Sequence, residues 1–310
     1  MRRSLGRDGI AGMRHSFFYR VIRRLKSLTI NASNRLGSSV PSSDSSMETS
    51  VLDSSSISGG IKSYLDVCRR AVLDLNLFAD FRRHPSYTPV LEHVTEAQGR
   101  EYLALISREG RAFASLSEAA KNDEIGNPVT MKLDVGFDVS PTTLRYLKVA
   151  DDLETLFGSL DGFDVVEIGV GYGGQCRLLD SLFELNSYTL VDLRPVLNLA
   201  DEFLAQFPLR TAIKLLTMNE LKASEYSLLL SNYAFTEIRR DVQETYYRKV
   251  FEHTARGYIT FNDISPTGFN SISRTELCDR LGAVTFPEKP LTHPKNSIIV
   301  WGNEGRVLGH

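Results

Sequence analysis

The spacing of hydrophobic and polar positions predicts a helical segment at the start of the folded part of the chain. From position 61 onward, apolar side chains recur at steps of three and four residues, which places them on one face of an amphipathic helix. The residues on this face are Ile61, Leu65, Cys68, Val72, Leu75 and Phe78. Further helices are expected near 90–106 and 113–121. Because this segment holds no catalytic cluster, we interpret residues 61–139 as a helical cap or lid.

The rest of the chain alternates between short β-rich runs and helical patterns. A helix is expected over 141–157, because Ser140 can cap it, Pro141 suits its first turn and Gly158 suits its end. Seven strands are then expected, at 163–168, 188–193, 212–217, 226–231, 258–262, 283–286 and 297–301. This alternation predicts an α/β fold with a doubly wound, mostly parallel sheet, in which ligands bind at the carboxyl ends of the strands.

The last two predicted strands indicate how the sheet ends. Only ten residues separate them, which favours an antiparallel hairpin over a connection through a crossover helix. We therefore expect a single domain over 140–310, built on a seven-stranded Rossmann-like sheet that closes with a C-terminal antiparallel hairpin.

Composition and charge add a separate front segment to this picture. The 310 residues carry a net charge of −2, yet residues 1–40 hold nine bases against one acid, and residues 37–60 contain eleven serines. We expect residues 1–60 to be a disordered tail and linker, whose basic part could make weak contact with a membrane surface. Three widely spaced cysteines give no disulfide or zinc pattern, so we expect a cytoplasmic protein without a structural metal. We expect no nucleic-acid partner.

The sharpest motif lies in FDVVEIGVGYGGQ, residues 163–175, where a buried-strand pattern runs into glycines and then into a helix. Gly169, Gly171 and Gly173 form G-x-G-x-G, and replacing the third by Gly174 gives G-x-G-x-x-G. Glycines let the backbone turn tightly and approach a ligand closely. The glycines alone therefore predict a nucleotide-type cofactor without separating one kind from another.

Two acidic residues narrow the choice of cofactor. Asp192 ends the second predicted strand, where a carboxylate can accept hydrogen bonds from both hydroxyls of a ribose. Glu167 lies two residues before the first glycine, where its charge would repel the phosphates of a dinucleotide and attract a cation. S-adenosylmethionine carries a positive sulfonium and an ammonium group. The sequence therefore favours this methyl donor over a dinucleotide.

At this point the chain resembles the seven-strand, class I methyltransferases that use S-adenosylmethionine, whose first motif is E/D-x-G-x-G-x-G, here residues 167–173. A closer resemblance, over about residues 80–303, is to a bacterial sugar O-methyltransferase family. The segments that carry it are HPSYTPVLEHV, QGREYL, GNPV, SPTTLRYLK, VVEIGVGYGGQCRLL, YTLVDL, SNYAFTEI, RGYITFND and NSIIVWG. This resemblance implies methyl transfer to a hydroxyl of a sugar, a nucleotide sugar or a glycan.

The same resemblance implies roles for individual residues. The three motif glycines would lie against the methionine portion of the cofactor, with Glu167 near its ammonium group and Asp192 on its ribose. The other implied cofactor contacts are Leu193, Met218, Asn219, Ser231 and Asn232. Asn219 could instead simply cap a turn, and the aromatic residues after Asn232 could serve packing as well as substrate binding.

A sugar hydroxyl is a weak acid, so a base must accept its proton during methyl transfer. The candidates are Glu237, Asp263 and His293, of which we favour the two carboxylates. Each has a structural alternative: Glu237 could cap a helix, Asp263 could close a turn, and His293 could be an exposed loop residue. A divalent metal held by the two carboxylates is a further alternative, although no spacing demands it.

Two other functions stay open. One is an NAD(P)-dependent sugar oxidoreductase or epimerase, against which the sequence lacks a Tyr-x-x-x-Lys pair. The other is a noncatalytic nucleotide-binding interaction protein, which remains open because the base is not identified. Arg145 and Tyr146, in the helix before the first strand, could close over the cofactor or the substrate or serve packing.

Overall fold

The computed structural model describes residues 61–133, 136–263, 265 and 267–309. The predictions for the basic and serine-rich segment 1–60 lie outside the described residues. Within the described part of the chain, no helix has both the length and the apolar character needed to cross a membrane.

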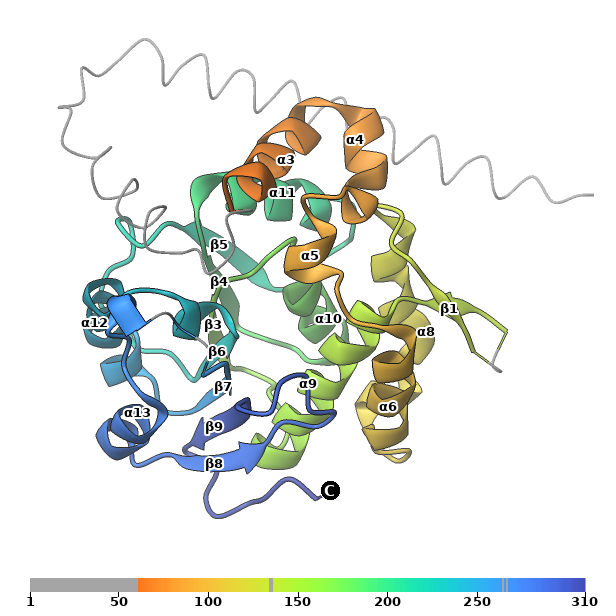
Figure 1. Cartoon of the computed structure of the whole chain (residues 1–310). Helices are drawn as coiled ribbons and strands as arrows, with labels where there is room; N and C mark the ends of the chain where they lie inside the picture. The colour runs from red at the N-terminus through yellow and green to blue at the C-terminus, as the bar shows by residue number, and fades with distance from the viewer. Residues whose placement is uncertain (1–60, 134–135, 264, 266, 310) are drawn as a thin grey trace, which may run out of the picture. The chain divides into compact units, whose positions relative to one another are not determined.

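The seven strands β3 to β9 follow α9 in the order that the hydrophobic pattern predicts, whereas the short strands β1 and β2 before α9 were not predicted (Figure 1). The α-helices are α3 Ile61–Leu73, α4 Leu75–Asp80, α5 Thr88–Leu91, α6 Glu96–Leu105, α7 Arg111–Ala114, α8 Leu116–Ala119, α9 Pro141–Phe157, α10 Gly174–Leu182, α11 Arg194–Leu204, α12 Arg240–Lys249 and α13 Arg274–Leu281. The 3-10 helices are η1 Phe81–Arg83, η2 Ala120–Glu124, η3 Ala234–Glu237, η4 Phe251–His253 and η5 Thr267–Phe269. The strands are β1 Met131–Lys132, β2 Asp138–Val139, β3 Asp164–Ile168, β4 Ser187–Val191, β5 Ala212–Leu216, β6 Leu228–Asn232, β7 Gly257–Phe261, β8 Val284–Pro287 and β9 Ser297–Trp301.

Strands β3 to β9 form a single seven-stranded sheet with the order β5-β4-β3-β6-β7-β9-β8. The first five strands in this order pair in parallel, whereas β9 pairs antiparallel with both β7 and β8. The fold prediction is confirmed, including the C-terminal antiparallel hairpin. The order reverses direction at β3, so the carboxyl ends of β3, β4 and β6 border a crevice at the switch point of the sheet.

Both faces of the sheet are covered, because successive side chains of a strand point to opposite faces. Val165 on β3 belongs to one core cluster together with residues of α9, α10 and α11. Val166, its neighbour, belongs to a second cluster with residues of α12 and α13. Burial of both faces of β3 is typical of a parallel sheet covered on both sides, and the carboxyl ends of such strands border the crevice.

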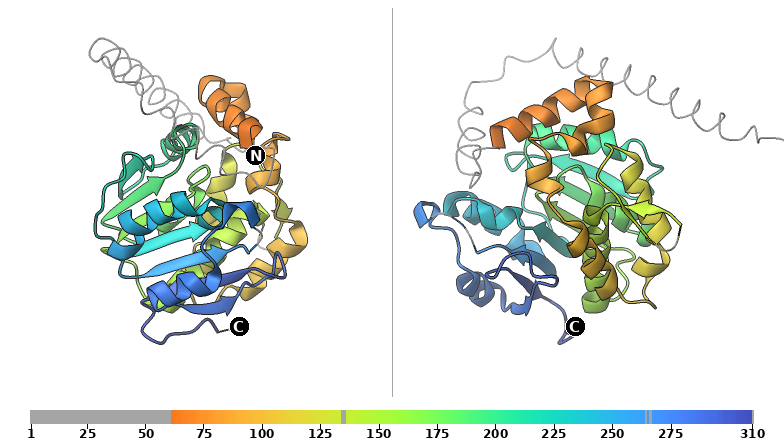
Figure 2. Two further views of the ribbon diagram at one scale, coloured as in Figure 1. Left: turned by 60° about the vertical axis from the view of Figure 1, so that its left-hand side comes forward. Right: turned by 45° about the vertical axis from the view of Figure 1, so that its right-hand side comes forward.

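The helical segment before α9 packs along one side of the sheet, next to α9 and α11, as both views of Figure 2 show. It is fixed by the buried guanidinium of Arg82, which donates to Glu92 at 2.6 Å and to Asp123 at 3.0 Å. Asp123 in turn accepts a hydrogen bond from the backbone N–H of Ser140 at 2.6 Å. Ser140 caps α9 as predicted, since its hydroxyl accepts from the backbone N–H of Thr143. This network fixes the start of α9 beside the crevice.

The antiparallel pairing of β7 with β9 leaves no room for a side chain at Gly257. A Cβ atom there would lie 2.0 Å from the indole ring of Trp301, the residue that pairs with Gly257 across the sheet. We expect Gly257→Ala to destabilise the protein by about 1–3 kcal/mol through overpacking, measured as a lower midpoint in thermal unfolding. Gly268→Ala is the matched control, because a Cβ there meets no atom within 4 Å. Equal midpoints for the two variants would contradict this packing.

Candidate functional site

A cavity of about 220 Å³ opens at the carboxyl ends of the parallel strands, at the point where the strand order reverses. Its walls come from five places: the glycine turn after β3, the ends of β4 and β5, the segment that runs from the end of β6 into α12, the helical segment before α9, and α9 itself. The cavity thus lies where the doubly wound topology predicts a ligand site.

Glycine is required at two positions of the turn after β3. Gly169 and Gly171 have φ of +80° and +55°, in the left-handed region that side chains rarely adopt. A Cβ on Gly169 would lie 2.0 Å from the Cβ of Ala234, and one on Gly171 would lie 2.7 Å from a methyl carbon of Leu91. Gly169 therefore lets the turn after β3 approach η3 closely, and Gly171 lets it approach the helical segment before α9.

Asp192 follows β4 and is held against the glycine turn by backbone hydrogen bonds. The backbone N–H of Val170 donates to Oδ2 at 2.8 Å, and that of Leu193 donates to Oδ1 at 2.7 Å. Burial nevertheless raises the pKa of Asp192 to about 6. Each carboxylate oxygen retains a lone pair, and the side chain lines the cavity, so Asp192 can accept hydrogen bonds from a ligand there.

Glu167 is a buried carboxyl group in the floor of the same cavity. Its side chain comes from β3 and is 2% exposed, and the hydroxyl of Tyr188 donates to its Oε2 at 2.8 Å. Burial, together with the charge of Asp192, raises the pKa of Glu167 to about 8. A cation in the cavity would favour the ionised carboxylate, because opposite charges at close range lower the pKa of an acid.

The remaining predicted cofactor contacts divide into two groups. Leu193, Met218, Asn219 and Asn232 line the cavity. Ser231 and Gly173 do not: the Ser231 hydroxyl is fully buried and donates to the Ile168 carbonyl at 2.9 Å, and Gly173 lies against Leu204. Both residues have structural roles. The Ser231 hydroxyl links β6 to β3, and Gly173 is the left-handed residue before α10.

The three candidate bases lie in different environments. Glu237 lines the cavity, accepts a hydrogen bond from the Asn262 amide at 2.7 Å, and has a pKa raised by burial. Asp263 and His293 are exposed, and neither lines the cavity. The structure thus brings only Glu237 to the predicted acceptor end. The described residues also hold no group of three or more His, Cys, Asp or Glu side chains able to bind a metal.

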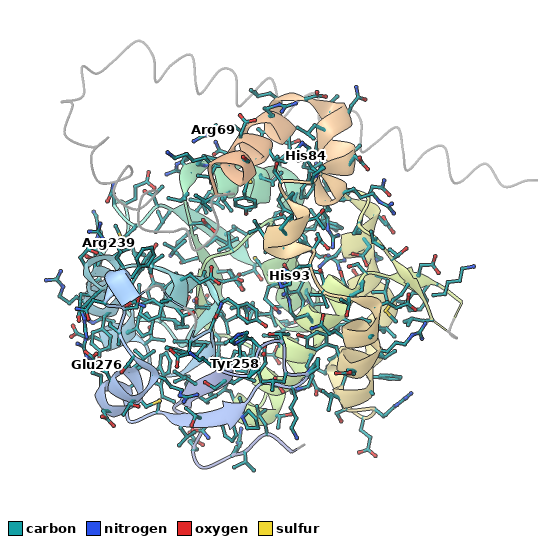
Figure 3. All side chains as sticks on the ribbon, viewed as in Figure 1. Arg69, His84, His93, Arg239, Tyr258 and Glu276 are labelled. Carbon is teal, nitrogen blue, oxygen red and sulfur yellow. The ribbon has the colours of Figure 1, made fainter. Side chains whose placement is uncertain are left out.

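Several lining residues were not predicted as site residues. His93 follows α5 and lines the cavity at its opening, near the centre of Figure 3. The His93 side chain is exposed, yet desolvation of part of its ring and the charge of Arg145 lower its pKa below the usual value. Tyr64 also lines the cavity, from α3. Nothing in the sequence signals these contacts, because they depend on how the helical segment packs over the sheet.

The chain is similar to a number of solved structures. No family model matches the chain, and no curated protein matches it. Among solved structures, it is similar to magnesium protoporphyrin IX methyltransferase from Synechocystis PCC 6803, with 12% identity, a TM-score of 0.39, and coverage of 50% of this chain and 77% of that one. It is also similar to the Thermoplasma acidophilum protein 1320, with 15% identity, a TM-score of 0.36, and coverage of 51% and 87%.

A third similar structure is the methyltransferase domain of bacterial CtHen1, with 17% identity, a TM-score of 0.36, and coverage of 50% of this chain and 96% of that domain. At these TM-scores the fold assignment rests on the strand order and register given above. The sugar O-methyltransferase resemblance stays a prediction.

Proposed function

We propose that this protein is an O-methyltransferase that uses S-adenosylmethionine and methylates a hydroxyl of a sugar, a nucleotide sugar or a glycan. The observation that carries the proposal is the buried carboxyl of Glu167 in the floor of a cavity formed by a glycine turn. A buried acid at this place suits a ligand with positive charge and opposes a pyrophosphate. The sugar acceptor rests on the sequence resemblance.

The lining residues fit the parts of this cofactor. Glu167 would hold the ammonium group, and Asp192 would accept hydrogen bonds from the ribose hydroxyls. Leu193 and Met218 would provide apolar contact for the adenine, beside the amide of Asn219. When bound, the cofactor supplies an activated methyl group with a good leaving group, so much of the catalysis falls to positioning, worth about 7–11 kcal/mol in favourable cases.

The acceptor would enter beside the end of β6. Asn232 and Tyr233 line the cavity there, and the Asn232 side-chain oxygen is held by the Thr260 hydroxyl at 3.0 Å. Glu237 would accept the hydroxyl proton as the new bond forms. Its raised pKa makes it a stronger base than an ordinary carboxylate once it is ionised. The Asn262 amide would hold its carboxylate in place.

The pKa of Glu167 predicts that cofactor affinity rises with pH. Below about pH 8 the free protein holds a proton on Glu167, and binding of the ammonium group must displace it. The dissociation constant for S-adenosylhomocysteine, which carries the same ammonium group, should therefore fall by about twentyfold between pH 6.0 and pH 7.5, because the ionised fraction of Glu167 rises by that factor. Isothermal titration calorimetry at both pH values measures the change. Proton release should appear as a dependence of the binding enthalpy on the buffer.

Glu167→Gln is the matched control for this pH effect, because the amide cannot ionise. In this variant the affinity should vary with pH only as far as Asp192, with a pKa of about 6, contributes. A pH dependence as steep as that of the wild type would remove Glu167 from contact with the ammonium group.

Incubation with methyl-labelled S-adenosylmethionine tests the function itself. The acceptors would be nucleotide sugars and glycan extracts, with lipid and RNA fractions beside them, and label transfer would be followed by mass spectrometry. The proposal expects the label in one sugar class, on a product that carries one added methyl group. Transfer of label to lipid or RNA fractions alone would contradict the sugar acceptor while retaining the methyltransferase activity.

A further inference from the structure

Arg145 carries a buried positive charge that forms no ion pair or hydrogen bond with a carboxylate of the described residues, and Glu92 acts on it only through a longer-range charge interaction. Its side chain comes from α9, is 7% exposed, and lines the cavity. The single hydrogen bond of its guanidinium runs from Nη2 to the Leu91 carbonyl at 3.4 Å. It also lies over the rings of Tyr146 and Tyr233, at 5.7 Å and 5.8 Å from their centroids.

The other buried cations of the described residues have acidic partners. Arg82 pairs with Glu92 and Asp123, Lys148 pairs with Asp152, and Arg177 pairs with Glu118. A buried charge without a partner is costly, and proteins retain one where it binds something. The two aromatic rings provide weak cation–π contacts that do not replace a counter-ion.

The position of Arg145 indicates where its partner would lie. Arg145, Asn232 and Tyr233 line both the main cavity and a second cavity of about 20 Å³, about the size of one water molecule. The guanidinium thus stands at the acceptor end of the site. Its planar fork of N–H donors matches a carboxylate or a phosphate, which it can bind with two parallel hydrogen bonds.

We propose that Arg145 binds an anionic oxygen group, a carboxylate or a phosphate, of a ligand in the main cavity. This inference rests on the proposed function, which supplies two sources of such a group. One is the amino-acid carboxylate of the cofactor. The other is an acidic group on the acceptor, such as the phosphate of a nucleotide sugar. The backbone N–H of Val170, in the glycine turn, already donates to Asp192 and is therefore not free to bind the same anion.

Calorimetric titration of the full chain and of its Arg145→Met variant tests this site and separates the two sources. The titrants are S-adenosylhomocysteine, 5′-methylthioadenosine, which lacks the amino-acid portion, and inorganic phosphate added to protein saturated with S-adenosylhomocysteine. If the cofactor supplies the anion, the variant should bind S-adenosylhomocysteine about tenfold or more weakly and methylthioadenosine normally. If the acceptor supplies it, the variant should bind S-adenosylhomocysteine normally and lose phosphate affinity by a similar factor.

Wild-type affinities for all three titrants in the Arg145→Met variant would overturn the proposal. If the wild-type protein does not bind S-adenosylhomocysteine, phosphate is titrated into the free protein instead, and phosphate binding that Arg145→Met weakens would mean that the proposed function fails and the anion site stands. If the wild type binds neither of them, the anion site is overturned as well. Arg145→Lys should partly restore the affinity, because it keeps the charge but not the fork.

Thermal unfolding separates binding from a structural role for Arg145. Loss of an unpaired buried charge should leave the unfolding midpoint of Arg145→Met at or above that of the wild type. A lower midpoint with unchanged affinities would assign Arg145 to packing and contradict the proposal. Arg100→Met is the control, because Arg100 is exposed on α6 and pairs with Glu96.

Discussion

Glu237→Gln is expected to reduce methyl transfer by about 10²–10⁴-fold while the affinity for the cofactor stays unchanged. The amide cannot accept the hydroxyl proton, yet it keeps the size of the carboxylate and can still accept a hydrogen bond from Asn262. Single-turnover transfer of labelled methyl groups to the acceptor measures the rate, and calorimetry with S-adenosylhomocysteine measures the affinity.

Asp263→Asn is the matched control for this variant, since it makes the same chemical change on a carboxylate that is exposed and does not line the cavity. It should keep the wild-type rate. Loss of transfer in Asp263→Asn together with full activity in Glu237→Gln would exchange the roles of the two residues.

Gly171→Val and Asp192→Ala are each expected to weaken the binding of S-adenosylhomocysteine by about 10²-fold or more. The first alters the cavity wall, and the second removes charge-assisted hydrogen bonds. At Gly171 a side chain would meet Leu91 at 2.7 Å and require φ of +55°. Asp192→Ala removes the acceptor for the ribose and leaves the N–H groups of Val170 and Leu193 without their partner. Calorimetry measures both affinities.

Gly162→Val separates loss of the cavity from general strain. Gly162 also has a positive φ, of +77°, but a Cβ there meets no atom within 4 Å, and the residue does not line the cavity. Gly162→Val should therefore lower stability without changing cofactor affinity. Wild-type affinity in both Gly171→Val and Asp192→Ala would show that the cofactor does not bind in this cavity.

The elements of the sheet could be predicted from the sequence because their signals are local. Buried strands such as Asp164–Ile168 are short runs rich in β-branched apolar residues, and Ser140, Pro141 and Gly158 mark the ends of α9 by their backbone preferences. The two-residue strands β1 and β2 were not predicted, because so short a pair gives no periodic pattern.

The site could be predicted only as far as it lies at strand ends. Glu167 and Asp192 follow from the strand pattern and line the cavity, as does Glu237. Asp263 also follows a strand, yet it is exposed, because the orientation of a loop side chain is set by tertiary packing. His93 and Arg145 reach the cavity through the packing of the helical segment and of α9, which local sequence patterns do not determine.

Titration of the full chain with S-adenosylhomocysteine and, separately, with NADH tests the central claim most directly. The buried acid beneath the glycine turn predicts saturable binding of S-adenosylhomocysteine, weakened in Asp192→Ala, and NADH binding that is much weaker or absent. NADH binding as tight as that of S-adenosylhomocysteine, or no binding of S-adenosylhomocysteine by the wild type, would contradict the account.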